Sequence, residues 1–389
     1  MRKGWEYKKL GEVLETTSGG TPSKSHKEYY EGGTIPWLRS GEVSKGDIYD
    51  AELYITEEGL KKSSAKLFPI DTVLIAMYGA TVGQVGILKS TMCTNQAICG
   101  ILPNKDFHPN FLKYVLLANK KNYLKQAMGG AQPNISQQVI KSTYIPIVKF
   151  SEQESVVSEL DKINELIRLK KEQLKDFDNL AQSLFYEMFG DPVENEKGWE
   201  VKKLGDICAD ITDGDHMPPP KSEFGIPFIT ISDIDKDTRC LNFENTFYVP
   251  EDYYNNLKEN RKPQKGDLLY TVTGSYGIPV IVKTDKKFCF QRHIALLRPN
   301  KEILSTIFLC YWVLSDGVKF MADKVATGIA QKTVGLNSIR KFSSILPPLP
   351  LQRLFAQRIE QIEREKSEVQ KSIQDLETLL ASRMQYWFE

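Results

Sequence analysis

The sequence contains no hydrophobic run long enough to cross a lipid bilayer. The longest apolar stretches, such as Phe308–Leu314, are far shorter than the roughly 20 residues that a membrane-spanning helix needs. The opening MRKGWEYKKL lacks the apolar segment of a secretory signal. The six cysteines (93, 99, 208, 240, 289, 310) show no C-x-x-C spacing and predict reduced thiols rather than a disulfide or zinc framework. These absences predict a soluble, cytoplasmic protein that makes no membrane contact.

Sequence signatures of catalysis are also missing. Gly41 and Gly46 have the spacing of a phosphate-binding loop, but Asp47 follows where that loop needs Lys and then Ser or Thr. The four histidines (26, 108, 216, 293) lack the spacing of metal ligands. The sequence has no Asn-Pro-Pro-Tyr or Asp-Pro-Pro-Tyr, the tetrapeptides that grip an extruded adenine in amino-methyltransferases. We therefore expect a chain that is not an enzyme and that binds no metal or cofactor itself.

Two long stretches, 151–189 and 351–389, each carry one apolar stripe at helical spacing. In the first, the stripe steps by four and three residues without a Pro or Gly, and Gly190 followed by Pro192 ends it. Ser151 with Glu154 reads as a capping box at its start. The steps of the first stripe are Val156, Leu160, Ile163, Ile167, Lys170, Leu174, Phe177, Ala181, Leu184 and Met188. Adding 199 to each of these positions gives the steps of the second stripe. Two matched stripes predict helices that pair as a coiled coil.

The regions before the two helices repeat each other. Trp5-Glu-Tyr-Lys-Lys-Leu-Gly-Glu12 recurs as Trp199-Glu-Val-Lys-Lys-Leu-Gly-Asp206, and Asn95-Gln-Ala-Ile98 has a looser counterpart in Gln291-Arg-His-Ile294. The chain therefore reads as a domain at 1–150, a helix at 151–189, a second domain at 190–350 and a second helix at 351–389.

Each domain mixes expected strands with one expected helix, so the predicted class is α+β with a central sheet. The expected strands are 72–77, 85–88 and 98–102 in the first domain and 267–272, 278–282 and 294–297 in the second, with helices at 111–126 and 303–314. A domain of this size is about 40 Å across. Such a domain cannot easily lead the chain back along a helix of about 58 Å for parallel pairing. We expect antiparallel helices, a domain at each end and a pseudo-two-fold repeat.

Charge is balanced overall but not locally. The net charge is +1, whereas residues 1–150 carry 19 basic and 13 acidic side chains. Residues 105–149 contain seven lysines and only Asp106, which is either a phosphate-binding patch or a solvated surface.

Polar, glycine-containing loops stand at equivalent places in the two domains. They are Tyr78–Gly83 with Gln96 and 132–136 in the first, and Thr273–Gly277 with Gln291, Arg292 and 331–333 in the second. Gln and Asn can read adenine, Arg can read guanine, and Ser, Thr and Lys suit phosphates. Each loop alone could be an ordinary strand-end turn, but the recurrence favours a shared polar surface.

The order of short strings along the whole chain resembles the specificity subunit of type I restriction–modification enzymes. The strings are S-G-G-T-P-S (18–23), I-P-W-L-R-S-G-E (35–42), A-M-Y-G-A-T-V-G-Q-V-G (76–86), N-Q-A-I (95–98), A-Q-P-N-I-S (131–136), L-Y-T-V-T-G-S-Y-G (269–277), A-Q-K-T-V (330–334) and L-P-P-L-P-L-Q (346–352). The resemblance implies two target-recognition domains spaced by two antiparallel helices, each domain reading one half of a bipartite double-stranded DNA target. The loop 213–221, with three consecutive prolines, departs from the first domain, so the two domains should read different sequences.

The resemblance also implies partners and DNA-binding residues. Two adenine-methylating subunits and, for cleavage, ATP-driven motor–nuclease subunits would join the chain, and AdoMet, ATP and Mg²⁺ would belong to them. Apolar flanks left by a two-helix rod, Leu166, Leu169 and Leu379, are the expected partner contacts. The candidate DNA-binding residues are Thr21, Lys24, Arg39, Tyr78, Gly79, Thr81, Gln96, Gln132, Asn134, Ser136, His216, Lys221, Thr273, Ser275, Tyr276, Gln291, Arg292, Gln331 and Lys332.

Two other functions remain open. A stand-alone nuclease or methyltransferase with an unfamiliar site would turn over DNA with AdoMet and Mg²⁺. A structural adaptor would use only its coiled coil and would not bind one bipartite duplex in a salt-sensitive way.

Overall fold

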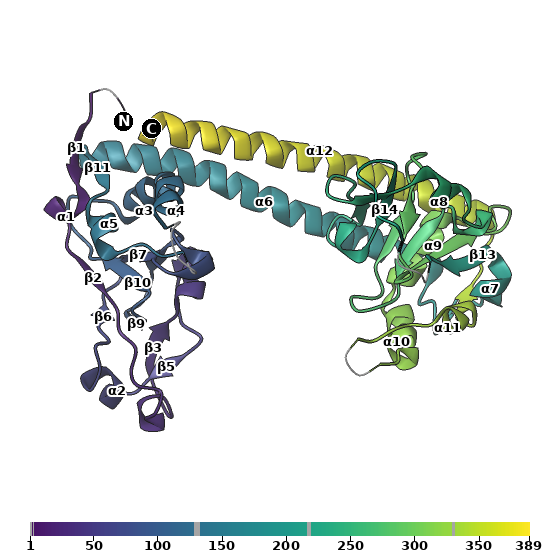
Figure 1. Cartoon of the computed structure of the whole chain (residues 1–389), viewed down its shortest axis with the longest axis horizontal. Helices are drawn as coiled ribbons and strands as arrows, with labels where there is room; N and C mark the ends of the chain where they lie inside the picture. The colour runs from purple at the N-terminus through teal and green to yellow at the C-terminus, as the bar shows by residue number, and fades with distance from the viewer. Residues whose placement is uncertain (1, 3, 128–132, 216–218, 329–330) are drawn as a thin grey trace. The chain divides into compact units, whose positions relative to one another are not determined.

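The computed structural model describes residues 2, 4–127, 133–215, 219–328 and 331–389, and the chain forms two compact units. The first unit is Met1–Lys171 with Lys371–Glu389, and the second is Glu172–Gln370. Each unit holds a globular domain and part of two long helices, α6 (Phe150–Phe189) and α12 (Leu349–Phe388) (Figure 1). The expected α+β class is confirmed. Within the described ranges, no helix combines the length and apolar composition of a membrane span.

The first unit contains two main sheets. The larger has the strand order β2 (Thr16–Ser18), β10 (Ile98–Ile101), β7 (Val73–Ala76), β8 (Val85–Leu88) and β4 (Asp47–Ile48), antiparallel except for β4 beside β8. The smaller has the order β5 (Tyr54–Ile55), β3 (Ile35–Leu38), β9 (Met92–Thr94) and β6 (Leu67–Phe68), with β3 and β9 parallel. A third pair joins β1 (Glu6–Lys9) to β11 (Tyr144–Ile147). The three sequence-predicted strands are thus three neighbours of the larger sheet.

The helices of the first unit, apart from α2 (Glu57–Lys61), cover one side of the larger sheet, whereas Leu60 of α2 packs beside the smaller sheet. Val85 and Ile87 of β8 and Phe111 and Val115 of the covering helix are all buried in one core, to which α6 adds Val156 and Leu160. The helical segments are α1 (Leu10–Val13), α2 (Glu57–Lys61), α3 (Pro109–Ala118), α4 (Lys120–Ala127) and α5 (Gln137–Lys141), with 3₁₀ turns at Lys27–Tyr29, Ser40–Lys45 and Gly79–Thr81. The core therefore ties the domain to the beginning of α6.

The second unit repeats this plan. Its larger sheet has the order β13 (Cys208–Asp213), β21 (Ile294–Pro299), β18 (Leu268–Thr271) and β19 (Pro279–Ile281), all antiparallel. Its smaller sheet has the order β17 (Phe247–Val249), β14 (Ile226–Ile229) and β20 (Cys289–Phe290), with β14 and β20 parallel. The pair β12 (Val201–Lys203) and β22 (Ser343–Ile345) matches β1 and β11. The expected repeat is therefore a repeat of sheet topology.

The two units differ at the sheet edges. In the first unit β4 extends the larger sheet beside β8. In the second, β15 (Ile234–Asp235) instead pairs with β16 (Cys240–Leu241) in a hairpin of its own.

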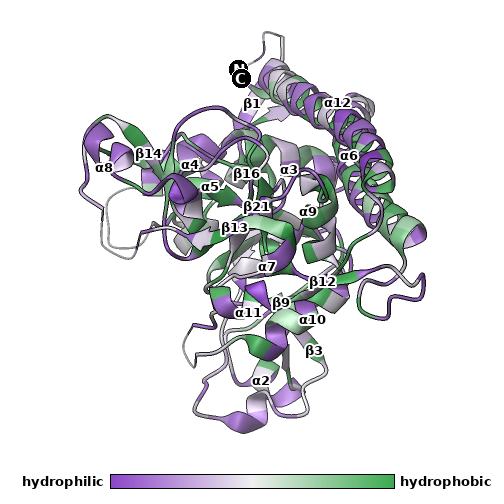
Figure 2. Ribbon diagram, turned by 90° about the vertical axis from the view of Figure 1, so that its right-hand side faces the viewer, coloured by the Kyte–Doolittle hydropathy of each residue, from purple (hydrophilic) through white to green (hydrophobic). Residues whose placement is uncertain are grey.

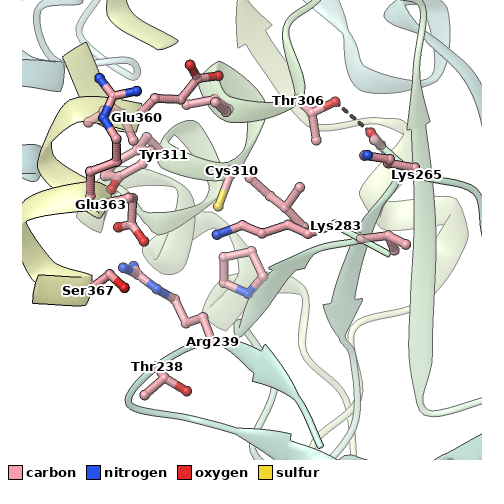
Figure 3. A pocket seen from close by; sticks show the side chains of 17 residues that line it. Thr238, Arg239, Lys265, Lys283, Thr306, Cys310, Tyr311, Glu360, Glu363 and Ser367 are labelled. Carbon is pink, nitrogen blue, oxygen red and sulfur yellow. Dashed lines mark hydrogen bonds between the residues drawn. The ribbon is translucent and has the colours of Figure 1, made fainter. Parts of the chain in front are cut away.

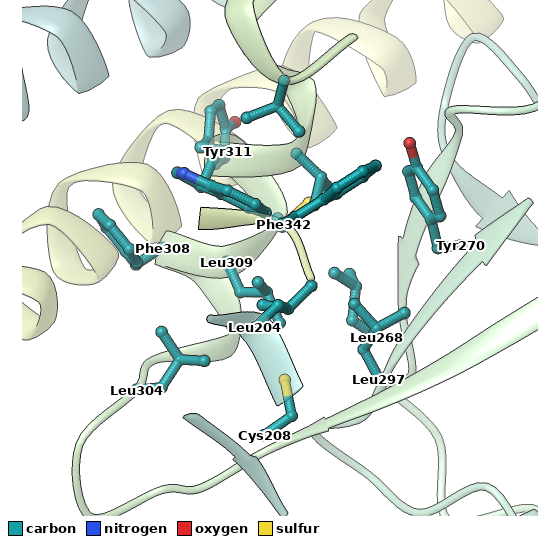
Figure 4. Packing of buried hydrophobic residues seen from close by; sticks show 14 of the residues in the cluster. Leu204, Cys208, Leu268, Tyr270, Leu297, Leu304, Phe308, Leu309, Tyr311 and Phe342 are labelled. Atoms are coloured by element: carbon teal, nitrogen blue, oxygen red, sulfur yellow. The ribbon is translucent and has the colours of Figure 1, made fainter. Parts of the chain in front are cut away.

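One hydrophobic core of the second unit lies between its larger sheet and its helices, apart from α8 (Glu251–Asn255), which packs on the smaller sheet. Leu268, Tyr270 and Leu297 of the sheet contact a layer that includes Phe308 and Leu309, and all five are buried (Figure 4). The helical segments are α7 (Leu204–Ile207), α8 (Glu251–Asn255), α9 (Thr306–Leu314), α10 (Asp316–Val325) and α11 (Leu336–Arg340), with 3₁₀ turns at Ile231–Asp233 and Glu259–Arg261.

In both units, α6 and α12 pair with each other, and the predicted apolar stripe of each helix lies on the side that meets the other helix. Ribbons of α6 and α12 alternate between hydrophobic and hydrophilic residues (Figure 2), as a single stripe requires. In the first unit, Glu159 accepts hydrogen bonds from the Arg383 guanidinium, and Lys171 Nζ lies 2.9 Å from Glu377 Oε1. The partner number falls as the α6 number rises, so the segments are antiparallel, as expected.

The same direction holds in the second unit. Lys366 Nζ lies 2.8 Å from Asp178 Oδ1, and further along α6 the Phe185 and Phe189 rings both contact Phe355, with ring centroids 5.8 and 5.3 Å apart. Lys366, a step of the stripe, is thus paired with a carboxylate of the facing helix.

The two ends of the chain meet in the first unit. The Trp5 ring stacks on Trp387 with centroids 5.9 Å apart, and the Arg2 guanidinium lies 4.2 Å from the Trp387 ring. Trp387 Nε1 also donates to Glu159. This cluster fastens the end of α12 to the first strand of the domain.

Three local expectations were wrong. The helix expected over 111–126 divides at Asn119, which caps α3 before α4 begins. The capping box at Ser151 is absent because α6 begins at Phe150, which places Ser151 inside the helix. The second domain's helix begins at Thr306 rather than at Ile303, since Ser305 has extended backbone angles.

Candidate nucleic-acid interface

Three segments of the first unit converge through backbone hydrogen bonds. Met77 N–H donates to the Ala97 carbonyl, and Ile135 N–H donates to the Met77 carbonyl. Two residues further along the first loop, Gly79 N–H donates to the Pro133 carbonyl at 2.9 Å. The loop that follows β7, the turn before β10 and the segment before α5 therefore lie side by side. This places most of the polar candidates of the first domain on one surface.

The second unit holds its counterpart segments with the same bonds. Val272 N–H donates to the His293 carbonyl, and Val334 N–H donates to the Val272 carbonyl. Gly274 N–H then donates to the Lys332 carbonyl at 3.0 Å. The expected equivalence of the polar loops is thus visible as one hydrogen-bond framework in two copies.

A glycine permits a close chain crossing at the rim of each framework. A Cβ on Gly19 would lie 2.2 Å from the Thr94 carbonyl oxygen, and one on Gly214 would lie 2.0 Å from the Phe290 carbonyl oxygen. Both distances are shorter than real Cβ contacts, so a side chain at either glycine would push the crossing strands apart.

Four candidates of the first domain line one pocket of about 570 Å³: Thr21, Lys24, Arg39 and Gln96. Lys27, Asn95 and the aromatic rings of Tyr30 and Trp37 line it with them. The Thr21 hydroxyl donates to Gln96 Oε1, which joins two segments that are 75 residues apart. Trp37 is buried and its indole N–H donates to the Gly20 carbonyl at 2.9 Å, which fixes the orientation of this ring in the pocket lining.

Carboxylates orient the arginine of this pocket. Arg39 Nη2 lies 2.6 Å from Glu52 Oε2, and Glu52 also contacts Lys45 at 3.3 Å. Lys45, with a smaller contribution from Arg39, holds the pKa of Glu52 below its ordinary value. Glu42 is buried and accepts from the Arg39 N–H at 3.1 Å. The Arg39 guanidinium is therefore held in place while its side chain stays half exposed.

The remaining candidates of the first domain lie around the Tyr78–Gly83 loop. Tyr78 is exposed and forms a β-bridge with Asn134, which is also exposed. Thr81 donates to the Tyr78 carbonyl at 3.2 Å, and Ser136 caps α5 by accepting from Val139 N–H. These two hydroxyls therefore shape the loops. Gly79 has a φ of 72°, a left-handed turn that glycine favours, and Gln132 lies outside the described residues.

Candidates of the second domain line a pocket of about 400 Å³. Thr273, Arg292 and Gln331 border it, together with His293 and Asp213. Arg292 and Gln331 are exposed, whereas Thr273 is buried and its hydroxyl lies 3.2 Å from that of Thr333. Thr273 is therefore part of the framework, and the exposed amide and guanidinium are the groups available to a ligand. Gln291 precedes Arg292 in the same turn, and exposed Lys332 follows Gln331.

Three further candidates of the second domain lie outside that pocket. Ser275 accepts from Lys236 Nζ at 3.2 Å, and the Tyr276 hydroxyl donates to Asp323, a residue of α10. Lys221 lies apart from both, with Nζ 5.2 Å from the Phe247 ring on the smaller sheet. His216 lies outside the described residues.

The sequence reasoning missed His293. His293 takes the place of Ala97 in the repeated hydrogen-bond framework, so an alignment of the two halves of the sequence could have identified it. Burial, and then the charge of Arg292, lower the pKa of His293, so the imidazole is neutral near pH 7. Arg292 Nε–H points to His293 Nε2 at 3.4 Å, which a neutral imidazole can accept.

The predicted partner contacts are exposed leucines on the long helices. Leu166, Leu169 and Leu379 are 48, 46 and 45% exposed, and all three belong to the first unit. Leu180, 199 positions before Leu379, is the equivalent residue in α6 and is 52% exposed in the second unit. The offset of 199 residues between the two stripes would have identified Leu180 from the sequence.

A different pocket in the second unit, of about 620 Å³, lies between α9, β19 and α12 (Figure 3). Its charged groups include Arg239 and Glu363, and its one thiol is Cys310. Burial raises the pKa of the Cys310 thiol to about 12, so this sulfur stays protonated and is not an activated nucleophile.

Comparison with known proteins agrees with this architecture. The family model described as the type I restriction modification DNA specificity domain matches residues 2–176 and 196–378. The MjaIX type I restriction enzyme specificity subunit of Methanocaldococcus jannaschii is 27% identical over 379 residues, 91% of this chain and 85% of that protein. The EcoKI specificity subunit of Escherichia coli strain K12 is 24% identical over 406 residues, 96% of this chain and 85% of that protein.

Solved structures share the fold. A chain from a study of complex assembly and conformational transition of the type I restriction–modification system has a TM-score of 0.65 at 21% identity, covering 100% of this chain and 98% of its own. The type I S subunit from M. genitalium has a TM-score of 0.51 at 14% identity, covering 99% and 96%.

The fold and the duplicated loop framework define a class of protein with two α+β domains joined by paired helices. The chain belongs to the type I restriction–modification DNA specificity family, whose model matches nearly all of it in two copies. It is a DNA specificity subunit of a type I restriction–modification system, and this subunit is the non-catalytic one.

Proposed function

We propose that each domain reads one half of a bipartite, spaced DNA target, and that α6 and α12 set the spacing between the halves. One observation carries this proposal. The same hydrogen-bond framework occurs in both units, yet the exposed side chains that it holds differ, with Gln96 in one and Arg292 in the other. A conserved framework with exchanged side chains suits two readers of different base sequences.

Exchange of one domain tests this proposal. Residues 199–345 are replaced by the matching segment of a related subunit, and methylated adenines are mapped in a host that also carries the partner methylase. We expect one half of the methylated motif to change and the other half to persist. Changes in both halves would mean that the domains do not read independently.

The spacing role is tested by lengthening both helices. One heptad inserted after Lys171 and another after Val369 keeps the Lys171–Glu377 and Asp178–Lys366 pairs on their own sides of the insertions. Each helix grows by about 10.5 Å, which is about 3 base pairs of DNA at 3.4 Å per pair. We expect a spacer longer by about 3 base pairs or loss of stable binding. Methylation at the original spacing and at the normal rate would refute this role.

We also propose that the exposed helix leucines help to scaffold two adenine-N6 methyltransferase subunits, joined for cleavage by motor–nuclease subunits. AdoMet, ATP and Mg²⁺ then act on those partners, and this chain binds double-stranded DNA without a cofactor. Incubation of the purified chain with DNA, AdoMet and Mg²⁺ separates this from a stand-alone enzyme, because only the enzyme predicts turnover. Salt-sensitive binding to one bipartite duplex separates it from a structural adaptor.

A further inference from the structure

We propose that Gln96 and Arg292 are equivalent specificity-determining residues, with Gln96 reading an adenine in one half-site and Arg292 reading a guanine in the other. This inference rests on the proposed function and assigns base contacts within it. Amides pair bidentately with adenine and guanidinium groups with guanine in the major groove.

The two residues occupy the same backbone position. In the first unit, Asn95 N–H donates to the carbonyl of Leu38, the last residue of β3, at 2.9 Å. In the second, Gln291 N–H donates to the carbonyl of Ile229, the last residue of β14, at 3.0 Å. Two positions after these donors, the Ala97 carbonyl accepts from Met77 N–H, and the His293 carbonyl accepts from Val272 N–H. Gln96 in the first domain and Arg292 in the second are therefore each flanked by residues that make the same two backbone hydrogen bonds.

Local contacts leave the reading groups of Gln96 available. Its side chain is exposed, and the Thr21 hydroxyl donates to Oε1 from one side. A carbonyl oxygen has a second lone pair, so Oε1 can still accept from the amino group of adenine while Nε2 donates to the ring nitrogen. Thr21 thereby limits the rotamers of Gln96, and less entropy is lost when a base is bound.

Arg292 is positioned in a similar way by a different neighbour. Its Nε–H points to His293 Nε2, which leaves the two terminal amino groups of the guanidinium for O6 and N7 of guanine. Asp213, an acidic residue that lines the same pocket, pairs with Arg261 at 3.4 Å. Arg292 itself lines this pocket and is exposed.

The experiment uses the assembled methyltransferase complex and two sets of duplexes, each of which carries the four bases in turn at every position of one half-site. We expect Arg292→Gln to lower the preference for guanine at one position by about 5- to 150-fold, the range typical of a bidentate pair. Arg292→Lys keeps the charge and should lose most of this preference with a smaller loss of affinity. Gln96→Arg should shift the preference at one position of the other half-site from adenine to guanine.

A matched control separates base reading from charge. Lys265→Gln removes one exposed positive charge from the same unit, outside the Arg292 pocket, and should leave all base preferences unchanged. An Arg292→Gln complex that weakens equally on every base would identify a phosphate contact and overturn the assignment. Unchanged preferences in both the Arg292 and the Gln96 variants would overturn it as well.

Failure of this assignment can be told from failure of the proposed function. The unsubstituted complex is measured first, on duplexes altered in one half-site at a time. If it does not recognise two separate half-sites, the proposed function and this assignment both fall. If it does and the variants keep its base preferences, only the assignment of Gln96 and Arg292 falls.

Discussion

A buried ion pair in the second unit should contribute strongly to its stability. Asp267, directly before β18, accepts from Arg298 Nε at 2.9 Å and from Nη2 at 2.8 Å, and its side chain is 3% exposed. Gln264 N–H donates to the same carboxylate at 2.8 Å. Asp267→Ala therefore leaves the largely buried Arg298 charge without its carboxylate. Loss of one partner of such a pair costs about 3–5 kcal/mol.

The matched control is an exposed pair of the same unit. Lys265 Nζ lies 3.7 Å from Asp285, and the side chains are 62 and 83% exposed. Asp285→Ala should change the free energy of unfolding by less than about 0.5 kcal/mol, because water already solvates both charges. The double variant Asp267→Ala with Arg298→Met should recover much of the loss, since no unpaired charge remains buried.

Hydrogen–deuterium exchange measures this effect in the full chain. A loss of 3–5 kcal/mol should accelerate amide exchange in β18 and β21 by about 150- to 5,000-fold, provided that exchange reports the opening equilibrium. Exchange in the first unit should stay near that of the unsubstituted protein and serves as an internal reference. Asp267→Ala exchange no faster than that of Asp285→Ala would refute the reasoning.

Two further predictions concern the first unit. Arg383 holds the pKa of Glu159 below its ordinary value of 4.5, so this carboxylate stabilises the folded unit fully above pH 4.5 and less as the pH falls through the lower folded value. Glu159→Gln should lower the free energy of unfolding by about 0.5–1 kcal/mol at pH 7 and by little at acidic pH. If the urea midpoints of the variant and the unsubstituted protein differed by the same amount at every pH in that range, the prediction would be contradicted. Leu166→Glu with Leu379→Glu should abolish complex assembly in size-exclusion chromatography while both domains stay folded. Leu67→Glu, an equally exposed leucine outside the helices, is the control, and a normal complex in both cases would contradict the scaffold role.

The long helices and the repeat were determined by the sequence itself. A stripe that repeats every third or fourth residue from Val156 to Met188, apolar at every step except Lys170, can be buried only along one face of a helix. It therefore identifies α6 without any tertiary information. The stop at Gly190, whose φ is 75°, follows from local backbone freedom in the same way. Strand β8 was predicted at its observed bounds because Val85–Leu88 is a short apolar run next to glycines.

Helix boundaries that depend on a single turn were less predictable. Asn119 splits one expected helix into α3 and α4, and its side-chain amide donates to the Val115 carbonyl at 2.9 Å. The free energies of such a cap and of a continued helix differ by only about 1 kcal/mol. The apolar periodicity of the sequence does not reveal so small a difference.

The make-up of the candidate interface was decided only by the tertiary structure. The sequence marked Gln96, Thr273 and Ser136 as equal candidates, yet Gln96 is exposed, Thr273 is buried against Thr333, and Ser136 caps α5. The reason is physical. Whether a loop side chain points to solvent depends on backbone hydrogen bonds between segments tens of residues apart, such as Met77 to Ala97, and neighbouring residues in the sequence do not encode those bonds.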